Sequence, residues 1–240
     1  MPSRVIREAL DAFPCSLIQG YGQTEGTTMT FLSQEDHNLA IRENFHPERL
    51  RSCGREGFVT TIRIVDADGN VVPQDNETPG EIIVKSKANM IGYFGRPDLT
   101  SQTIRNGWMW TGDIATWDSD GYCYIVDRAK DMIISGGANI YPAEIESVFL
   151  MHPKVQDVAV FGIPNEEWGE EIKAVVELND EEITEEDIKN DLMEFASENL
   201  AKMKHPRSID LIDKLPRDEN GKLFKRKLRD PYWENQDRQV

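Results

Sequence analysis

A short polar loop near the N-terminus carries three residue types that nucleotide-binding sites use. Tyr21 offers a flat ring for a base, Thr24 a hydroxyl for a phosphate, and Glu25 a hard oxygen for Mg²⁺. The glycines of the same loop let a ligand approach the backbone closely. A turn between a strand and a helix, with Thr24 as its capping residue, explains the same residues, so both interpretations stay open.

A second acidic position follows an aromatic segment. Asp113 closes the sequence Thr-Gly-Asp at 111–113, directly after Gly-Trp-Met-Trp at 107–110. A carboxylate at the end of a strand can accept hydrogen bonds from both ribose hydroxyls, as the acidic residue of dinucleotide sites does. Taken alone, Asp113 is better explained as a turn aspartate.

Two later segments could also serve a ligand. Gly136 and Gly137 precede a helix and leave room for a thin, flexible ligand along the backbone, although paired glycines more often mark only a loop. Lys222 lies in a charged C-terminal segment and could bring a mobile positive charge to a phosphoryl group. The basic residues around Lys222 could form a nucleic-acid patch, but a solvated basic end fits an acidic protein better.

Composition places the chain among soluble globular proteins and disfavours several functions. Its 240 residues carry 27 Lys and Arg against 43 Asp and Glu, a formal net charge of −16, which makes a general nucleic-acid binder a poor fit. The apolar runs are far shorter than the roughly 20 residues that span a bilayer, and no stretch of signal-peptide type opens the sequence. Three widely spaced cysteines fit a reducing compartment, so we expect a cytoplasmic protein.

The first half of the chain is expected to be rich in short strands. A helix over 5–12 and a strand over 16–18 come first. Between 58 and 126, alternating runs such as 61–65 and 81–84 are separated by turn residues. This pattern predicts a small antiparallel barrel or twisted sheet.

The second half alternates helices with buried strands. Pro142 is typical of the first turn of a helix, and the apolar runs 158–161 and 174–176 predict buried strands. Thr184, followed by Asp187 three residues later, predicts the capped start of an amphipathic helix that ends near residue 205.

These elements define the expected fold class and domain organisation. We expect an α+β protein whose residues 1–127 end in a small antiparallel β-barrel-like subdomain and whose residues 128–240 form a compact α+β domain. About 110 residues is an ordinary size for such a domain. The expected boundary lies near residues 128–130.

The order and spacing of five motifs carry more information than any one of them. The motifs are Tyr-Gly-Gln-Thr-Glu at 21–25, Thr-Gly-Asp at 111–113, Asp-Arg-Ala-Lys-Asp-Met-Ile-Ile-Ser-Gly-Gly-Ala-Asn-Ile-Tyr-Pro-Ala-Glu-Ile-Glu at 127–146, Pro-Asn-Glu-Glu-Trp-Gly-Glu at 164–170 and Pro-Arg-Asp-Glu-Asn-Gly-Lys at 216–222. Together they resemble the AMP-forming acyl-CoA synthetases of the adenylate-forming superfamily. The chain looks like the C-terminal portion of such an enzyme: the end of the large AMP-binding domain, then the mobile C-terminal lid.

The resemblance implies a two-step ligase that uses ATP, Mg²⁺ and coenzyme A. A carboxylic acid, expected to be a long- or medium-chain fatty acid, attacks the α-phosphate of ATP to give an acyl-adenylate and pyrophosphate. The thiol of coenzyme A then displaces AMP. A carrier-protein thiol is the alternative acceptor, and the run from Ser135 to Tyr141 favours free coenzyme A.

The resemblance also implies roles for individual residues. It assigns nucleotide binding to Tyr21, Gly22, Thr24, Asp113 and Arg128. It assigns catalysis to Lys222, Glu25 and Thr24, with Glu25 as the Mg²⁺ ligand. It makes Lys130 the hinge and places the pantetheine arm of coenzyme A at Gly136 and Gly137. The part of the acyl pocket that this chain could supply is assigned to Gly20, Gly26 and Thr27.

One departure from the family pattern bears on the activity of the isolated chain. The family's glycine- and Ser/Thr-rich phosphate loop precedes the first of the five motifs, and this sequence does not contain it. We therefore expect the isolated chain to be inactive. A non-catalytic fragment that only binds or assembles is the remaining alternative, and an exposed former interface would favour self-association.

Overall fold

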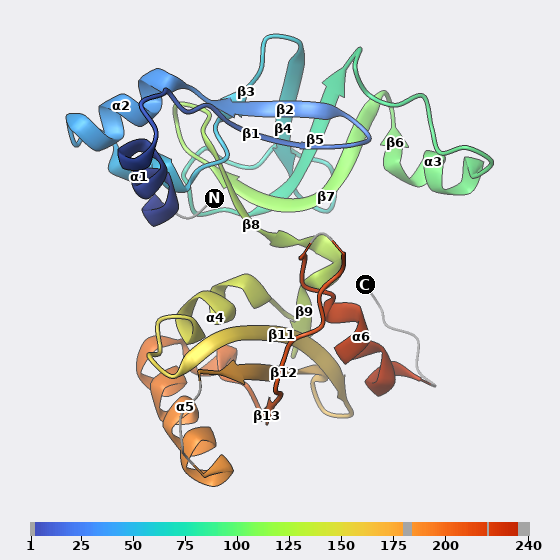
Figure 1. The fold of residues 1–240 in the computed structure, drawn as a ribbon. Coiled ribbons are helices and arrows are strands. Elements are labelled where there is room, and N and C mark those ends of the chain that lie inside the picture. The colour runs from blue at the N-terminus through green and yellow to red at the C-terminus, as the bar shows by residue number, and fades with distance from the viewer. Residues whose placement is uncertain (1–2, 180–183, 220, 235–240) are drawn as a thin grey trace. The chain divides into compact units, whose positions relative to one another are not determined.

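The computed structural model describes residues 3–179, 184–219 and 221–234. The chain divides into two compact units, Met1–Val126 and Asp127–Val240. Both units combine helices with mainly antiparallel sheets, which confirms the predicted α+β class (Figure 1). Within the described ranges, no helix is both long enough and apolar enough to cross a bilayer.

The first unit combines two antiparallel sheets with short helices. One sheet has the order β1-β2-β3, formed by β1 Gln19–Gln23, β2 Thr27–Leu32 and β3 Arg55–Glu56. The other has the order β4-β5-β7-β6, with β8 also paired to β7, and consists of β4 Thr60–Val65, β5 Gly80–Ser86, β6 Ile104–Arg105, β7 Trp108–Trp117 and β8 Cys123–Arg128. The helical elements are α1 Ser3–Ala12, α2 Gln34–Arg42, the 3-10 turn η1 Pro47–Arg51 and α3 Pro97–Thr103.

The core of the first unit lies between β2 and the curved sheet of β4, β5 and β7 (Figure 1). Alternate residues of β4 and β5 point inward, so that Ile62, Ile64, Ile82 and Val84 are buried. Met29 of β2 packs against them and is fully buried. Burial of each such side chain stabilises the unit by about 1.5–3 kcal/mol. The barrel-like antiparallel arrangement predicted for residues 58–126 is confirmed.

The first strand begins later than the sequence pattern predicts. Residues 16–18 are not in a strand, and β1 instead contains much of the polar loop, which forms a hairpin with β2. The pairing shifts register between Tyr21 and Gly22, where the two backbones come close together. A Cβ atom on Gly22 would lie 1.8 Å from the carbonyl oxygen of Thr27, so this position requires glycine. Glycine in a strand weakens the sequence signal for a strand, which explains the error.

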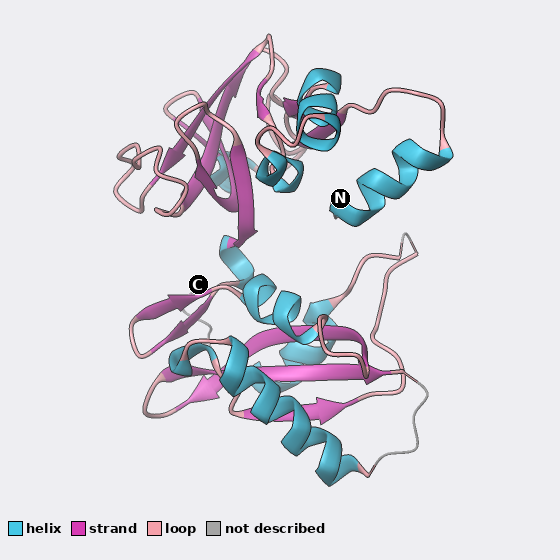
Figure 2. Ribbon diagram, turned by 90° about the vertical axis from the view of Figure 1, so that its left-hand side faces the viewer, coloured by secondary structure: helices cyan, strands magenta, loops and turns pink. Residues whose placement is uncertain are grey.

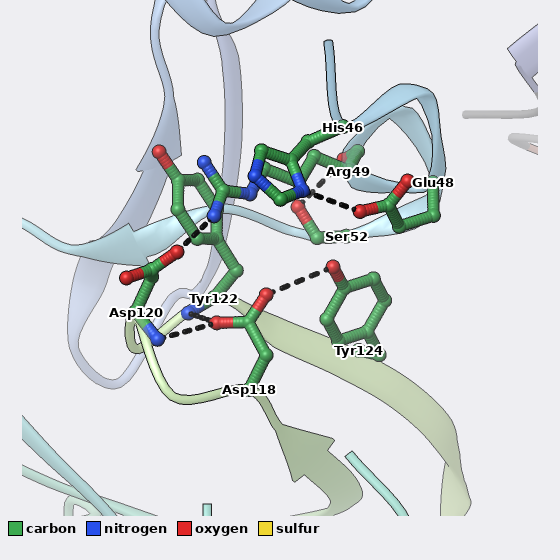
Figure 3. A network of polar contacts seen from close by, with 8 residues as sticks. All are labelled: His46, Glu48, Arg49, Ser52, Asp118, Asp120, Tyr122 and Tyr124. Atoms are coloured by element: carbon green, nitrogen blue, oxygen red, sulfur yellow. Dashed lines mark hydrogen bonds and ion pairs between the residues drawn. The ribbon is translucent and has the colours of Figure 1, made fainter. Parts of the chain in front are cut away.

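A polar network fastens the turn between β7 and β8 to η1 (Figure 3). Asp118 accepts hydrogen bonds from the backbone N–H groups of Asp120 and Tyr122, and its other oxygen accepts one from the Tyr124 hydroxyl. Arg49 forms an ion pair with Asp120 and lies 4.2 Å from the centroid of the Tyr122 ring. The network therefore fixes the start of β8, the last strand of this sheet.

The N-terminus of α2 makes the stability of the first unit depend on pH. Buried Asp36 accepts hydrogen bonds from the backbone N–H of Ser33 at 2.8 Å and from the Tyr122 hydroxyl at 2.5 Å. Burial alone would raise the pKa of Asp36, but these hydrogen bonds outweigh it and hold the pKa below the ordinary 3.8. A lowered pKa adds stability above the unfolded-state value of about 4, and this stability is lost as the pH falls through the folded-state pKa.

We predict that Asp36→Asn lowers the melting temperature by several degrees at about pH 7 and by progressively less as the pH falls toward about 2, because the stability from the carboxylate is lost as the pH falls through its lowered folded-state pKa. Thermal unfolding at both pH values measures the effect. Glu35→Gln, an exposed change in the same first turn, is the control and should have a clearly smaller effect at pH 7 than Asp36→Asn, because an exposed charge at a helix N-terminus contributes only about 0.3–1 kcal/mol. Equal destabilisation by Asp36→Asn at both pH values would contradict the role of the charge.

The second unit is built around one mixed sheet. Its strand order is β10-β9-β12-β11, and β13 pairs with β12 in parallel. The strands are β9 Ile133–Ser135, β10 Ala138–Ile140, β11 Val155–Asn165, β12 Gly169–Leu178 and β13 Ser208–Leu211. The helical elements are η2 Ala129–Asp131, α4 Pro142–Phe149, α5 Glu185–Asn199, η3 Lys202–Lys204, α6 Lys225–Arg229 and η4 Asp230–Trp233.

Helices α4 and α5 cover one face of this sheet (Figure 2). Val158 and Val160 of β11 point to that face and share a buried cluster with Ile145 of α4 and Leu192 of α5. Residues 158–161 are buried on both faces of the sheet, which explains their continuous apolar run. The two buried strands predicted for this half of the chain are confirmed.

The opposite face of the same sheet is covered by the C-terminal segment. Ala159 and Phe161 belong to a second cluster with Leu215, Leu223 and Leu228. The interpretation of the C-terminal region as a solvated basic end is therefore wrong in part. Its apolar residues pack on the sheet at intervals, and the basic residues between them mask this pattern in the sequence.

The helix boundaries in this unit follow the predicted signals at their starts. Pro142 is the first residue of α4, and the Thr184 hydroxyl accepts a hydrogen bond from the Asp187 N–H at 3.2 Å as the cap of α5. Helix α5 ends at Asn199, earlier than the predicted end near residue 205. The backbone of Leu200 is extended and breaks the helix there, before η3 begins.

Candidate nucleotide-binding site

A buried carboxylate on β7, that of Asp113, binds two side chains of β1. The Tyr21 hydroxyl donates a hydrogen bond to Asp113 Oδ2 at 2.6 Å, and the Gln23 amide donates to the same oxygen at 2.7 Å. The Gln23 amide also donates to the backbone oxygen of Thr111 at 2.8 Å. Asp113 is 4% exposed. Burial, and then the Asp113 carboxylate, raise the pKa of Tyr21, so its hydroxyl remains a donor at neutral pH.

Local hydrogen bonds fix the position of Asp113 on β7. The Thr111 hydroxyl donates to the backbone oxygen of Ile82 at 2.8 Å, and its oxygen accepts the Asp113 N–H at 3.1 Å. The Gly112 N–H donates to the Glu81 carboxylate at 2.8 Å. The pairing of β5 with β7 shifts register at this point. The Thr-Gly-Asp sequence thus forms a local irregularity that presents the carboxylate toward β1.

The turn of the β1–β2 hairpin carries the predicted phosphate and metal ligands. Thr24 is exposed in this turn, and Glu25 is half-buried. Glu25 Oε1 accepts a hydrogen bond from the Tyr93 hydroxyl at 3.0 Å, and the backbone oxygen of Glu25 accepts one from the Met90 N–H at 2.6 Å. A carboxylate oriented by a neutral donor suits Mg²⁺, which prefers one or two carboxylates together with phosphate oxygens. No group of three or more His, Cys, Asp or Glu placed to hold a metal occurs within the described ranges.

The three predicted acyl-pocket residues lie on the same hairpin. Gly20 and Thr27 are exposed, whereas Gly26 is buried. A Cβ atom on Gly26 would lie 2.7 Å from the terminal methyl groups of both Met29 and Met109. Any side chain at this position would therefore require two core methionines to move, while Gly20 and Thr27 stay accessible to a ligand.

The second unit has a cleft of about 690 Å³ next to the predicted catalytic lysine. Arg128, Lys130 and Lys222 all line it, so the structure brings these three predicted residues together. Lys222 is exposed, and its backbone N–H donates to the Asp218 carboxylate at 2.9 Å. Asn220 of the same motif lies outside the described residues. Lys and Arg outnumber Asp in its lining by six to three, and this excess of positive charge suits a phosphate-bearing ligand.

Gly136 and Gly137 form the turn between β9 and β10. Both have positive φ angles, 58° and 79°. The Gly136 N–H donates to the backbone oxygen of Trp168 at 2.8 Å, and a Cβ atom on Gly136 would lie 2.6 Å from Cε3 of the Trp168 ring. A Cβ atom on Gly137 would meet no atom within 4 Å. Both glycines therefore have a left-handed backbone, but only Gly137 has free space for a side chain.

We predict that Gly136→Ala lowers the melting temperature more than Gly137→Ala does. Both changes add backbone strain of about 1–2 kcal/mol, and only the first also forces Trp168 to move. Thermal unfolding of the two variants measures the difference. In a Trp168→Ala background the difference should disappear, and its persistence there would show that the indole ring is not its cause.

Three contacts of the site were not predicted from the sequence. Gln23 belongs to the first motif but has no nucleotide chemistry of its own, and it acts here by binding Asp113. Tyr93 lies 68 residues from Glu25, and no local pattern connects them. Trp168 belongs to the fourth motif, and its contact with the β9–β10 turn depends on the pairing of β9 with β12.

Comparison with known proteins identifies the family. The model described as AMP-binding enzyme matches residues 1–94, and the model described as AMP-binding enzyme C-terminal domain matches residues 144–222. The chain therefore belongs to the AMP-binding enzyme family. Its relatives are acid:CoA ligases, and it corresponds to their C-terminal portion.

Individual relatives act on different acids. The feruloyl-CoA synthase of an Amycolatopsis species is 39% identical over 214 residues, which is 89% of this chain and 41% of that protein. The long-chain-fatty-acid–CoA ligase of Escherichia coli is 40% identical over 214 residues, 89% of this chain and 36% of that protein. The solved structure of o-succinylbenzoate CoA synthetase from Bacillus subtilis, in complex with its acyl-adenylate intermediate, has 35% identity and a TM-score of 0.78 over 95% of this chain and 43% of that one. The chain thus spans about 40% of the length of the curated relatives it matches.

Proposed function

We propose that this chain supplies the ribose-binding residues and the C-terminal domain of an ATP-dependent acid:CoA ligase. The observation that carries the proposal is the buried Asp113 carboxylate, which two donors, Tyr21 and Gln23, hold at a family motif position. A carboxylate so held can accept hydrogen bonds from both ribose hydroxyls of the nucleotide. The exposed Lys222 in a cationic cleft supports the same function.

The proposed reaction has two steps. In the first, a carboxylate oxygen of the acid attacks the α-phosphorus of ATP, the bond between this phosphorus and the bridging oxygen breaks, and pyrophosphate leaves. In the second, the thiol of coenzyme A loses its proton to solvent, its sulfur attacks the acyl carbonyl, and the bond to AMP breaks. Lys222 stabilises the negative charge that gathers at the α-phosphate in the first step. Mg²⁺ bound through Glu25 would neutralise phosphate charge.

For the acid we propose a long- or medium-chain fatty acid. Relatives named as fatty-acid–CoA ligases support this choice, although others are named for feruloyl and succinylbenzoyl substrates. The full-length protein should be assayed with ATP, coenzyme A and a panel that contains a long-chain fatty acid, ferulate and 2-succinylbenzoate. We expect thioester formation to be fastest with the fatty acid. Faster turnover of an aromatic acid would overturn the choice of acid without affecting the ligase proposal.

For the acceptor we propose free coenzyme A. The glycine turn at Gly136 and Gly137, with open space at the second position, supports passage of the slender pantetheine arm. The same assay with a carrier protein in place of coenzyme A tests the acceptor. Faster transfer to the carrier would favour the alternative of an adenylation enzyme that serves a carrier protein.

A role in binding or assembly without catalysis is the second candidate. Phe58, Ile91 and Phe94 favour it, because these large apolar side chains are almost fully exposed and would favour self-association. Light scattering of the purified chain would detect such association, and pyrophosphate exchange by the same chain above a Lys222→Ala background would contradict a non-catalytic role.

We further propose a cytoplasmic location, since none of the three cysteines forms a disulfide.

A further inference from the structure

Lys222 stands on a turn that its own hydrogen bonds close. The backbone N–H of Asp218 donates to the carbonyl oxygen of Lys222 at 2.9 Å, and the Asp218 carboxylate accepts the Lys222 N–H at the same distance. Arg217 and Leu223 form a β-bridge across the base of the turn. The position of the Lys222 side chain in the second unit therefore depends on what holds the two arms of the turn.

The arm before the turn is attached to the sheet through two carboxylates. Glu177 of β12, which is buried, accepts the backbone N–H of Leu215 at 2.7 Å. Asp157 of β11 forms an ion pair with Arg217. These contacts come from neighbouring strands and fix the direction in which the chain enters the turn.

The arm after the turn packs on the sheet through Leu223 and Leu228, and Arg229 at its far end lies 3.6 Å from Asp131. The attachment closest to Lys222 that involves charges is an ion pair of low exposure. Lys225 begins α6, three residues after Lys222, and its Nζ lies 2.6 Å from Glu146 Oε1 of α4. The two side chains are 17% and 16% exposed. Glu146 Oε1 also accepts the backbone N–H of Val160 in β11 at 2.7 Å. The Glu146 carboxylate thus connects α4, on which it lies, to the start of α6 and to β11 of the central sheet.

Two other basic residues of α6, Arg226 and Lys227, are held differently from Lys225. Arg226 pairs with Asp230 four residues later, at the surface of the same segment. Lys227 is exposed and lies 5.3 Å from the centroid of the Phe224 ring. Neither contact connects α6 to the body of the unit, so Lys227 provides a matched control for Lys225.

We propose that the Lys225–Glu146 pair is a positioning device for Lys222 in the adenylation step. This rests on the proposed function, in which Lys222 contacts the reacting phosphate. Loss of the pair loosens the start of α6, although Leu223, Leu228 and Arg229 still hold the rest of the arm, and lets the Lys222 ammonium shift. Because a displacement of about 1 Å at a reacting group can cost about a hundredfold in rate, the adenylation step is sensitive to this change. The thioester step does not use Lys222 and is insensitive.

The test compares Lys225→Met with Lys227→Met in the full-length protein. Acid-dependent ATP–pyrophosphate exchange reports the first step, and thioester formation from supplied acyl-adenylate and coenzyme A reports the second. We expect Lys225→Met to lower the kcat of exchange by about 10–100-fold. The rate of thioester formation should stay within about twofold of wild type. Lys227→Met should change neither step. Equal loss of both steps, or no loss, would overturn the proposal.

A second variant and a physical readout keep the inference separate from folding and from the proposed function. Lys225→Arg retains the charge and should restore most of the exchange activity. Hydrogen exchange of the amides in residues 217–223 should be at least tenfold faster in Lys225→Met than in Lys227→Met. If the wild-type protein exchanges no pyrophosphate, the proposed function fails, and the amide measurement alone decides whether the pair holds the turn. Unchanged amide exchange would show that it does not.

Discussion

Lys222→Ala in the full-length protein should lower acid-dependent ATP–pyrophosphate exchange by about 10²–10³-fold, equivalent to about 2.7–4 kcal/mol of transition-state stabilisation. The adenylation transition state gathers negative charge around the α-phosphorus, and a positioned ammonium stabilises it more than it stabilises the bound substrates. The loss should therefore fall on kcat. Exchange measured at saturating ATP and acid, in parallel with thioester formation from supplied acyl-adenylate, tests this expectation.

The structure indicates that this variant will fold. The Lys222 side chain is exposed, and the turn uses only its backbone N–H and carbonyl oxygen, which alanine retains. The melting temperature should stay within about a degree of wild type, as is usual for exposed substitutions. Lys214→Ala, another exposed change in the same segment, is the control and should keep full exchange activity. Near-wild-type exchange by Lys222→Ala would remove Lys222 from the catalytic role.

Elements whose signal is local could be predicted from the sequence. The buried runs of β11 and β12, the Thr184 cap and the position of Pro142 each depend on residues within a few positions of one another. The predicted start of the first strand was wrong. Strand β1 contains two glycines and is therefore poor in the β-branched and aromatic residues that are typical of strands. Its pairing with β2, and not its own composition, makes it a strand.

The C-terminal segment shows what local patterns cannot provide. Its basic residues suggested a solvated end because their partners are far away in the sequence. Arg217 pairs with Asp157, which is 60 residues distant, and Lys225 pairs with Glu146 on another helix. A partly buried charge requires a partner, but the sequence does not say which carboxylate will be adjacent. Which carboxylate becomes the partner depends on the tertiary fold, because the C-terminal segment packs on the sheet that contains β11.

The same reasoning applies to the residues that we propose bind the nucleotide. Tyr21 and Asp113 are 92 residues apart, and each alone has an ordinary explanation as a turn residue. The resemblance to a family indicated that they act together. The structure adds that they contact each other directly and that Gln23 shares the same carboxylate oxygen. This contact makes the carboxylate the next position to test.

Asp113→Asn should raise the KM for ATP by about 10²-fold, with a smaller effect on kcat. Hydrogen bonds to a charged acceptor contribute about 1.5–3 kcal/mol each, and an amide offers only one acceptor oxygen where the carboxylate offers two. The substitution also places an NH₂ group near the donors of Tyr21 and Gln23, which disturbs the local geometry. Titration of ATP in the exchange assay, together with calorimetric binding of AMP, measures the effect.

Tyr21→Phe separates the contribution of the Tyr21 hydroxyl to ATP binding from that of the Asp113 carboxylate. It retains the ring that would flank the adenine and removes only one donor to Asp113, whose carboxylate still accepts from Gln23 at 2.7 Å. The KM for ATP should therefore rise by about tenfold or less, the value of one hydrogen bond. If Tyr21→Phe were as harmful as Asp113→Asn, the hydroxyl and not the ribose contact would dominate binding. If neither changed the KM, the carboxylate would be a structural residue of the β1–β7 contact, and the ribose would have to bind elsewhere.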